Sequence, residues 1–267
     1  MSKLHLAVPA VFFGVFLVVS PTSAQTPSNS PEQPSAVKTN EPQKLPDEDM
    51  GRLYLVRKDY KQAQELFHKL TLEHPNHAVY WNELGIALHS QMDLNGALKC
   101  YEKSAKLDKH YSDPLNNIGT VYYERKKYAK AIRSYKRALA IRDDFAPFYL
   151  NLGYAYFAQK QFEDSITAFR TALKYDPEAF DPSKSRSGTV IQDRSIATDR
   201  AQFYFLLAKS FAEAGNAERC ALYLRKARDE GYQQMNTVNS DPSFAKVIKD
   251  PAIQDVLTLR PPESPQQ

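Results

Sequence analysis

Histidine and cysteine are the side chains of this sequence best suited to metal or redox chemistry. His74 and His77 form an H-x-x-H pair beside Pro75, and His68 precedes them by six residues. A zinc site needs three or four ligands, and we identify no cysteine or acid that completes the set, so we expect no metal and no cofactor. Cys100 and Cys220 could form a disulfide in an oxidising compartment.

Sequence patterns of known catalytic sites do not occur in this chain. We find no glycine-rich phosphate loop, no G-x-S-x-G and no H-E-x-x-H. The formal net charge is +4 over 267 residues, and the basic residues are spread among acids rather than gathered in a stripe. A nucleic-acid surface would need such a stripe. We therefore expect neither an enzyme with a small-molecule substrate nor a nucleic-acid-binding protein.

The two ends of the chain differ in composition from the middle. Residues 1–24 hold one lysine, an apolar run and then small residues, which is the order of a secretory signal peptide with cleavage after Ala24. The alternative is a retained membrane anchor, but the run is short for a span of about 20 residues and contains Pro9. Residues 25–46 and 260–267 are rich in proline and poor in large apolar side chains, which predicts a disordered linker and tail.

A 34-residue repeat organises the middle of the chain. Glycines stand at positions 51, 85, 119 and 153. Three residues after each glycine stands tyrosine or leucine, twelve after it alanine or serine, and sixteen after it phenylalanine or tyrosine. Each period thus predicts two helices joined by a short polar turn. Small side chains let two helices approach closely, so we expect glycine and alanine to face each other, with the aromatic rings above and below.

These columns resemble the tetratricopeptide repeat, whose pattern runs W-x2-L-G-x2-Y, then A-x3-F, then A and P. The second period reads "WNELGIAL" and then "ALKCYEKSAKLDK", and the fourth reads "YLNLGYAY" and then "SITAFRTALKYDP". The resemblance covers residues 44 to about 177. It implies an all-α, right-handed superhelical solenoid of helix-turn-helix repeats, with repeats 1–4 at residues 47–177.

A fifth repeat and a cap follow an interruption. Residues 201–231 fit the same columns, with Ala208 in place of glycine and Cys220 in place of alanine. The intervening residues 178–200 form an insertion, which is either functional or disordered, since loops of that length are usually one or the other. In residues 232–259, Asp241-Pro242 and Asp250-Pro251 predict two short helices that cap the open end of the solenoid.

The family resemblance also implies a binding surface on the concave side, lined mainly by first helices. The family's lining positions, carried over to this sequence, predict a peptide groove of Asn82, Ile86, Asn116, Thr120, Tyr123, Leu150, Tyr154, Phe157 and Phe205. The same positions include Val79, His89, Asp113 and Lys209. An alternative is that Phe157 and Phe205 merely pack against a neighbouring helix or the insertion.

Two narrower uses of the surface and the cysteines are disfavoured. A clamp for a terminal carboxylate would need basic partners, and this chain offers Asn117 and Asn151 but Pro147 at those positions. If helix layers stack roughly 10 Å apart, cysteines in repeats two and five would be about 30 Å apart, beyond the reach of a disulfide. We expect two separate thiols, with Cys220 in the core.

The sequence thus predicts an exported, periplasmic or secreted scaffold without enzymatic activity or stable membrane insertion. Its expected partner is a protein or peptide held in the concave groove, in envelope assembly or secretion. The alternative is a permanent structural subunit of an envelope complex that uses the convex face. A binding role for the fold rests on the family resemblance, because a fold alone does not determine function.

Overall fold

The computed structural model describes residues 45–181 and 199–258, and these are helical without a β-strand. The predicted all-α solenoid is confirmed. Ten helices form five successive pairs: α1 (Asp47–Arg57) with α2 (Tyr60–Glu73), α3 (Ala78–Ser90) with α4 (Leu94–Leu107), α5 (Asp113–Glu124) with α6 (Tyr128–Leu139), α7 (Ala146–Ala158) with α8 (Phe162–Tyr175), and α9 (Arg200–Glu213) with α10 (Ala217–Asp229). The expected signal peptide, the linker up to residue 44, the insertion from 182 to 198 and the tail lie outside the described residues.

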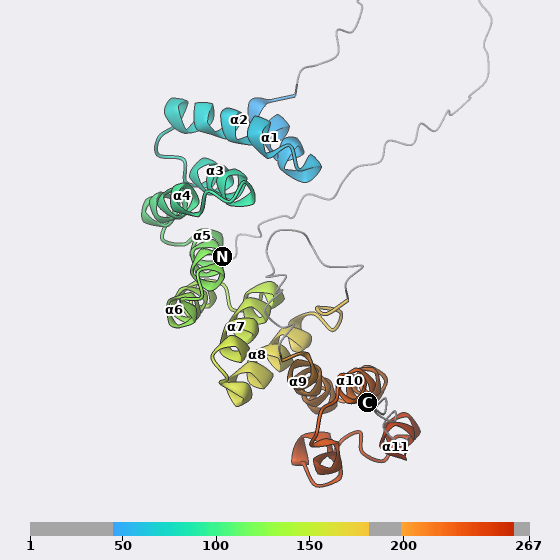
Figure 1. Ribbon diagram of the computed structural model, residues 1–267. Helices are drawn as coiled ribbons and strands as arrows, with labels where there is room; N and C mark the ends of the chain where they lie inside the picture. Colours follow the sequence, from blue (N-terminus) through green and yellow to red (C-terminus); the bar gives the residue numbers. More distant parts are fainter. Residues whose placement is uncertain (1–44, 182–198, 259–267) are drawn as a thin grey trace, which may run out of the picture. The chain divides into compact units, whose positions relative to one another are not determined.

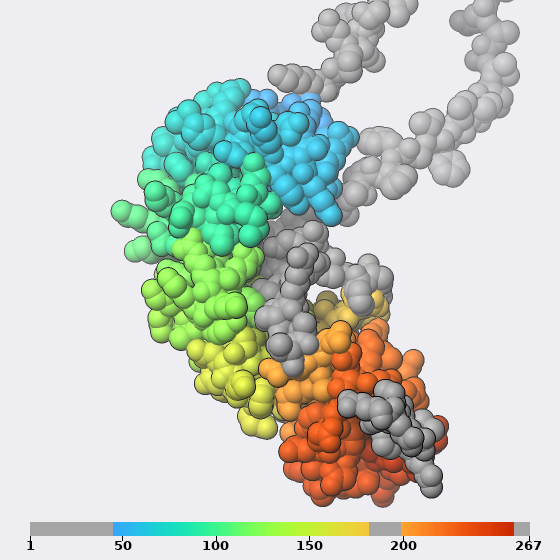
Figure 2. Space-filling model, viewed as in Figure 1, coloured from blue at the N-terminus to red at the C-terminus, as the bar shows by residue number. Residues whose placement is uncertain are grey.

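The pairs pack on one another in chain order (Figure 1). Within each pair the two helices contact each other, and the second helix also contacts the first helix of the next pair. In addition α3 contacts α5, and α5 contacts α7, so these first helices form one continuous row. In the space-filling view the colours pass from blue through green to red in successive bands (Figure 2). The row of first helices is therefore one surface built by several pairs.

The turn between the two helices of a pair repeats the same backbone geometry. Lys58, Met92, Lys126 and Lys160, each 34 residues after the last, all have a positive φ between 56° and 67°. In the third pair, the N–H groups of residues 126 and 127 donate to carbonyls of the preceding helix at 2.7 and 2.8 Å, which satisfies the last turn. The fifth pair has Gly215 there, the residue that adopts this conformation without strain.

The repeated glycines make room for an aromatic ring of the partner helix. We expected glycine to face alanine, and the structure corrects this: the ring sixteen residues later lies directly on the glycine. A Cβ atom built on Gly85 would be 2.5 Å from Cε1 of Tyr101, and the same clash recurs between Gly119 and Tyr135. The alanines twelve residues after the first three glycines are fully buried beside these rings. The close approach is therefore between backbone and ring.

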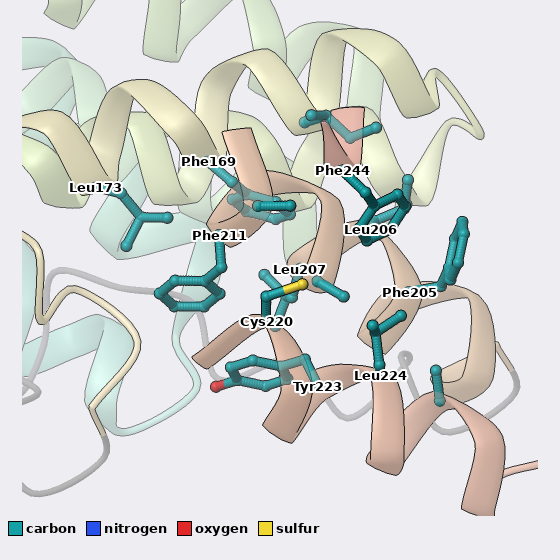
Figure 3. Packing of buried hydrophobic residues seen from close by; sticks show 14 of the residues in the cluster. Phe169, Leu173, Phe205, Leu206, Leu207, Phe211, Cys220, Tyr223, Leu224 and Phe244 are labelled. Atoms are coloured by element: carbon teal, nitrogen blue, oxygen red, sulfur yellow. The ribbon is translucent and has the colours of Figure 1, made fainter. Parts of the chain in front are cut away.

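The fifth pair and the C-terminal segment share a large hydrophobic cluster (Figure 3). The segment consists of the 3₁₀ turns Met235–Asn239 and Pro242–Phe244 and the helix α11 (Pro251–Thr258). The first of the two expected helices is thus only a 3₁₀ turn. Asp241 and Asp250 nevertheless act as caps, since each carboxylate accepts a backbone N–H two residues on at 2.9 Å. Phe244, Ile253 and Val256 are buried in the cluster.

The start of the insertion belongs to the packed part of the molecule. We expected the insertion to begin at residue 178, but Ala179 and Phe180 pack against the same cluster. The Phe180 ring lies 5.2 Å from that of Phe169 and 5.8 Å from that of Phe211, measured between centroids. Helix α9 then begins at Arg200. The packed unit therefore extends to Asp181.

The two cysteines lie in different hydrophobic clusters. Cys100 packs with Tyr80 and Leu84, and Cys220 lies among residues of the fifth pair, where Figure 3 shows its sulfur close to Leu207. Both thiols are free and buried. Burial raises the pKa of the Cys100 thiol to about 11 and that of Cys220 to about 12. Neither is placed to act as a nucleophile.

Candidate functional site: a cleft on the first helices

A cleft of about 520 Å³ opens over the first helices of the first three pairs. Its walls combine amide, charged and apolar side chains from α1, α3 and α5 and from the turns that follow α1, α4 and α6. The lining consists of Arg52, Leu55, Val56, Lys58, Tyr60, Asn82, Glu83, Ile86, Ser90, Tyr111, Asp113, Asn116, Asn117, Arg142 and Phe145. The cleft is large enough for a few residues of an extended chain.

A ladder of asparagine side chains begins in the cleft, which Asn82, Asn116 and Asn117 line, and continues to the buried Asn151 of α7. Asn151 Nδ2 donates to Asn116 Oδ1 at 2.8 Å, and Asn116 Nδ2 donates to Asn117 Oδ1 at 3.4 Å. Asn117 Nδ2 donates to Asn82 Oδ1 at 3.0 Å, and Asn82 Nδ2 donates to the hydroxyl of Tyr111 at 3.0 Å. Three first helices are thus joined side chain to side chain.

The repeat spacing explains why the ladder forms. Asn82 and Asn116 occupy the same place in successive repeats, 34 residues apart, and Asn117 and Asn151 share the next place. The two long-range bonds within the ladder therefore span 35 residues. The row stops in the fourth repeat, where Leu150 stands at the place of Asn82 and Asn116. The ladder thus runs from α3 to α7 and ends there with Asn151.

Two carboxyl groups face this cleft from adjacent helices. Glu83 stands on α3 and Asp113 at the start of α5, and both are half-buried. Burial, followed by the nearby charges of Asp113 and Glu48, raises the pKa of Glu83 to about 7 against the opposing effect of Arg52. Burial also raises the pKa of Asp113, against the effect of Arg142. The cleft therefore disfavours the ionised forms of Glu83 and Asp113.

The arginines of the cleft have partners of their own. Arg52 Nη2 lies 2.6 Å from Glu48 Oε1, within α1. Arg142 lies 3.7 Å from Asp144, and its guanidinium is also 3.7 Å from the ring centroid of Phe145. Each arginine thus has a neighbour that compensates part of its charge.

The histidines are not part of this cleft. His77 stacks on Tyr80 with centroids 3.8 Å apart, and His74 lies 5.9 Å from the same ring in a tilted arrangement. Residues 45–181 and 199–258 contain no group of three or more histidine, cysteine, aspartate or glutamate side chains that could hold a metal ion. The H-x-x-H pair has a packing role at the turn between α2 and α3.

Family comparisons agree with the repeat seen in the structure. Models described as tetratricopeptide repeat match residues 48–114 and 146–178, and one described as TPR repeat matches residues 119–160. The chain is a tetratricopeptide repeat protein. Its fifth repeat, α9 and α10, lies beyond these matches and is assigned from the structure.

Solved structures were compared with this tetratricopeptide repeat protein, and PilF shares its fold. PilF of Pseudomonas aeruginosa aligns with a TM-score of 0.51 at 18% identity, over 79% of this chain and 85% of that one. MamA of Desulfovibrio magneticus RS-1 aligns at 0.48 and 18%, over 73% and 96%. YrrB, described as a TPR protein with an unusual peptide-binding site, aligns at 0.45 and 14%, over 72% and 88%. No curated protein sequence matches the chain significantly.

Tetratricopeptide repeats are modules for protein interaction, so the chain is assigned as a protein-interaction scaffold. Among the residues that the structure describes, no helix is both long and apolar enough to cross a membrane.

The structure brings together only part of the predicted peptide groove. Asn82, Ile86 and Asn116 line the cleft, although both asparagines are buried. Thr120 is half-buried; its hydroxyl donates to the Asn116 carbonyl at 3.3 Å and accepts from Tyr135 at 3.4 Å. Both hydrogen bonds of Thr120 join residues of the third repeat.

The other predicted groove residues lie at packing positions in the structure. Tyr123 and Leu150 are buried in hydrophobic clusters. Phe157 is buried 5.2 Å from Phe203, and Phe205 is buried and stacked on Tyr232 with centroids 4.2 Å apart.

Tyr154 is half-buried and stacks on Phe203, with centroids 5.7 Å apart. The family's lining positions presume an open inner face, whereas here Phe203 of α9 lies against Tyr154 and Phe157. Tyr232 and Phe244 likewise lie against Phe205. Phe157 and Phe205 pack against neighbouring elements, as the alternative interpretation expected.

Several residues of the cleft were missed because they fall outside the family's lining positions. Glu83 stands one residue after such a position, and Arg52 belongs to the first repeat, from which we predicted no groove residue. A signal for Glu83 was present: it is an acid between Asn82 and Leu84 on a helix otherwise rich in apolar residues. Tyr111, in the turn before α5, had no such signal.

Proposed function

We propose that this protein is an exported, non-enzymatic scaffold that holds an extended segment of a protein partner in the cleft formed by α1, α3 and α5. The observation that carries the proposal is the asparagine ladder, because it places side-chain amides in the lining of an open cleft. Envelope assembly or secretion is the process that would need such a scaffold outside the cytoplasm.

The ladder suits the backbone of an extended chain. A primary amide carries two N–H donors and an oxygen with two lone pairs, and Asn82, Asn116 and Asn117 each donate one N–H in the ladder. Asn117 is half-buried and lines the cleft, so it can offer its second N–H to a partner's carbonyl. Because the amides already fix one another, little side-chain entropy is lost on binding. Ile86 and Leu55 supply apolar contacts beside them.

Site-specific photocrosslinking tests where the partner lies. A photoreactive phenylalanine derivative replaces Ile86 in the cleft. In a control it replaces Glu102, an exposed residue of α4, which is a second helix of its pair. We expect a discrete crosslinked protein from position 86 that is lost when Asn117 is also changed to alanine. Circular dichroism of each variant verifies that the fold persists.

The same experiment distinguishes the alternative of a permanent structural subunit. Crosslinks from position 102 and none from position 86 would contradict a working cleft and would favour binding through the outer face. A stable complex that co-purifies with the unmodified protein would point the same way. Crosslinks confined to position 86 would exclude the outer-face alternative for that partner.

Export rests on the sequence of residues 1–24, whose charged start, apolar run and small residues are those of a signal peptide. The test is fractionation of cells that produce the whole chain, with sequencing of the N-terminus of the recovered protein. We expect a periplasmic or secreted product that begins at Gln25. A product that begins at Met1 and sediments with membranes would show a retained anchor instead.

A further inference from the structure

We propose that the segment held in the cleft carries a lysine or arginine whose cationic head lies between the carboxylates of Glu83 and Asp113. This rests on the proposed function, since it names the chemistry of the segment that the cleft accepts. The argument comes from the cleft's geometry, from the partners of its charged groups and from what a cation would contribute there.

The two carboxylates line the same cavity from neighbouring helices. Glu83 comes from α3 and Asp113 from α5, two helices in direct contact, and both residues line the same cavity. The negative charge of Asp113 acts on Glu83, and the charges of both act on the phenol of Tyr111, which lies in the same cavity. The three acidic groups therefore form one cluster in the cleft wall.

Neither carboxylate has a hydrogen bond or an ion pair with any residue that the structure describes. This differs from the other half-buried acids of the chain. Asp241, for example, accepts the backbone N–H of Ser243 and lies 3.2 Å from Lys209 Nζ. The charged oxygens of Glu83 and Asp113 are thus available to a ligand.

The cations of the cleft do not supply the missing partner. Arg52 is bound to Glu48 at 2.6 Å, and Glu48 also accepts the Tyr80 hydroxyl at 2.9 Å, which fixes that pair to α3. Arg142 lies between Asp144 and the Phe145 ring. Lys58 is exposed at the end of α1. The charge that is left without a close partner in the cleft is therefore negative.

A lysine or arginine head would satisfy what the cleft lacks. Its N–H groups would form charge-assisted hydrogen bonds with both carboxylates, and these are stronger than neutral ones. Burial already raises the pKa of both acids, and a cation would reverse that effect. Since Glu83 adjoins Asn82 of the ladder, the backbone and the basic side chain would be held side by side. An acidic segment would be repelled.

Peptide selection on the purified whole chain tests the proposal. Random dodecapeptides displayed on phage are selected, and the strongest binder is synthesised with arginine at its basic position and with citrulline, which has nearly the same shape without the charge. Fluorescence anisotropy then compares wild type, the double variant Glu83→Gln, Asp113→Asn, and the control double variant Glu65→Gln, Glu102→Gln. The control removes the same net charge from exposed residues of α2 and α4.

We expect selected peptides to share a basic residue, and the arginine form to bind wild type and the control at least about tenfold more tightly than the citrulline form. That difference should vanish in the Glu83→Gln, Asp113→Asn variant. Two results would overturn this inference while the proposed function stands. In the first, Ile86→Glu abolishes binding but the arginine and citrulline forms bind equally well. In the second, the preference for arginine survives in the double variant. If no peptide is selected, or Ile86→Glu leaves binding unchanged, both are overturned.

Discussion

The ring of Tyr101 occupies the place where a side chain of Gly85 would be, with Cε1 only 2.5 Å from a Cβ atom built on that glycine. The same relationship joins Gly51 to Phe67, where the nearest ring atom would be 2.8 Å away. Tyr101 is 1% exposed and Phe67 is fully buried. The glycine column is therefore a steric requirement of the aromatic column in the partner helix.

Replacing Gly85 with alanine should destabilise the protein although alanine favours helix. The gain in helix propensity is about 1 kcal/mol, whereas forcing a methyl group against a buried ring costs roughly 1 to 3 kcal/mol. Urea unfolding measures the free energy of unfolding. In a Tyr101→Ala background the alanine should be tolerated, so the two changes should be strongly coupled. A Gly85→Ala protein more stable than wild type would contradict the steric account.

Phe244 should anchor the C-terminal cap. It is fully buried and lies 5.8 Å from the ring of Phe205. Phe244→Ala should lower the free energy of unfolding by about 3 to 5 kcal/mol, since it leaves a cavity. Leu222→Ala, in the exposed face of α10, is the matched control and should change it by less than about 0.5 kcal/mol. Equal effects would mean that the cap contributes little to the fifth repeat.

Glu83→Gln should stabilise the protein in a pH-dependent way. Burial raises the pKa of Glu83 to about 7, above the value of about 4.3 expected in the unfolded chain. The folded state then binds more protons between these values, so wild-type stability falls as pH rises through that window. The Glu83→Gln variant has no carboxyl group to titrate at this position, so its stability does not fall in this way.

The advantage of Glu83→Gln should be small near pH 4.5 and reach roughly 3 to 4 kcal/mol above pH 7. Urea unfolding at several pH values measures it. The control Glu65→Gln, on the exposed face of α2, should show no such dependence. A constant difference between Glu83→Gln and wild type would contradict the burial of this carboxyl group.

Both cysteines should resist modification in the folded protein. Cys100 is 7% exposed and Cys220 is fully buried, and the raised pKa of each keeps the thiol protonated near neutral pH. A thiol reagent such as iodoacetamide should therefore label neither until urea unfolds the chain, when two labels should appear by mass spectrometry. Rapid labelling of Cys220 in native buffer would show that the fifth repeat opens.

The sequence was sufficient for the helix pairs because spacing carries that information. Columns such as Gly85 and Gly119 recur every 34 residues, and each marks a first helix packed on the ring sixteen residues later. The direction of the contact was not readable, because a column of small residues is equally compatible with an alanine or an aromatic partner. Only the three-dimensional structure shows that the ring lies on the glycine.

The candidate site was predicted only in its first half, for a physical reason. The same repeat position is polar and in the cleft at Asn82 but apolar and buried at Leu150. Whether an inner position is open depends on what covers it, and Phe205 is covered by Tyr232 and Phe244 from the cap. The position of Glu83 on an otherwise apolar helix marks it in the sequence, but its lack of a partner depends on residues of other helices.

Helix α1 gives the cleft one wall that is weakly attached. Of its eleven residues only Gly51 is buried, while Tyr54 and Leu55 are half-buried against the cluster around Phe67. Two polar contacts join it to α2 and α3: Lys69 with Asp47 at 2.7 Å and Tyr80 with Glu48 at 2.9 Å. Segments with few buried groups open at a small fraction of the global unfolding free energy. A partner could therefore enter and leave by transient detachment of α1 alone, so residence time in the cleft would be set by the first helix while the remaining repeats stay folded.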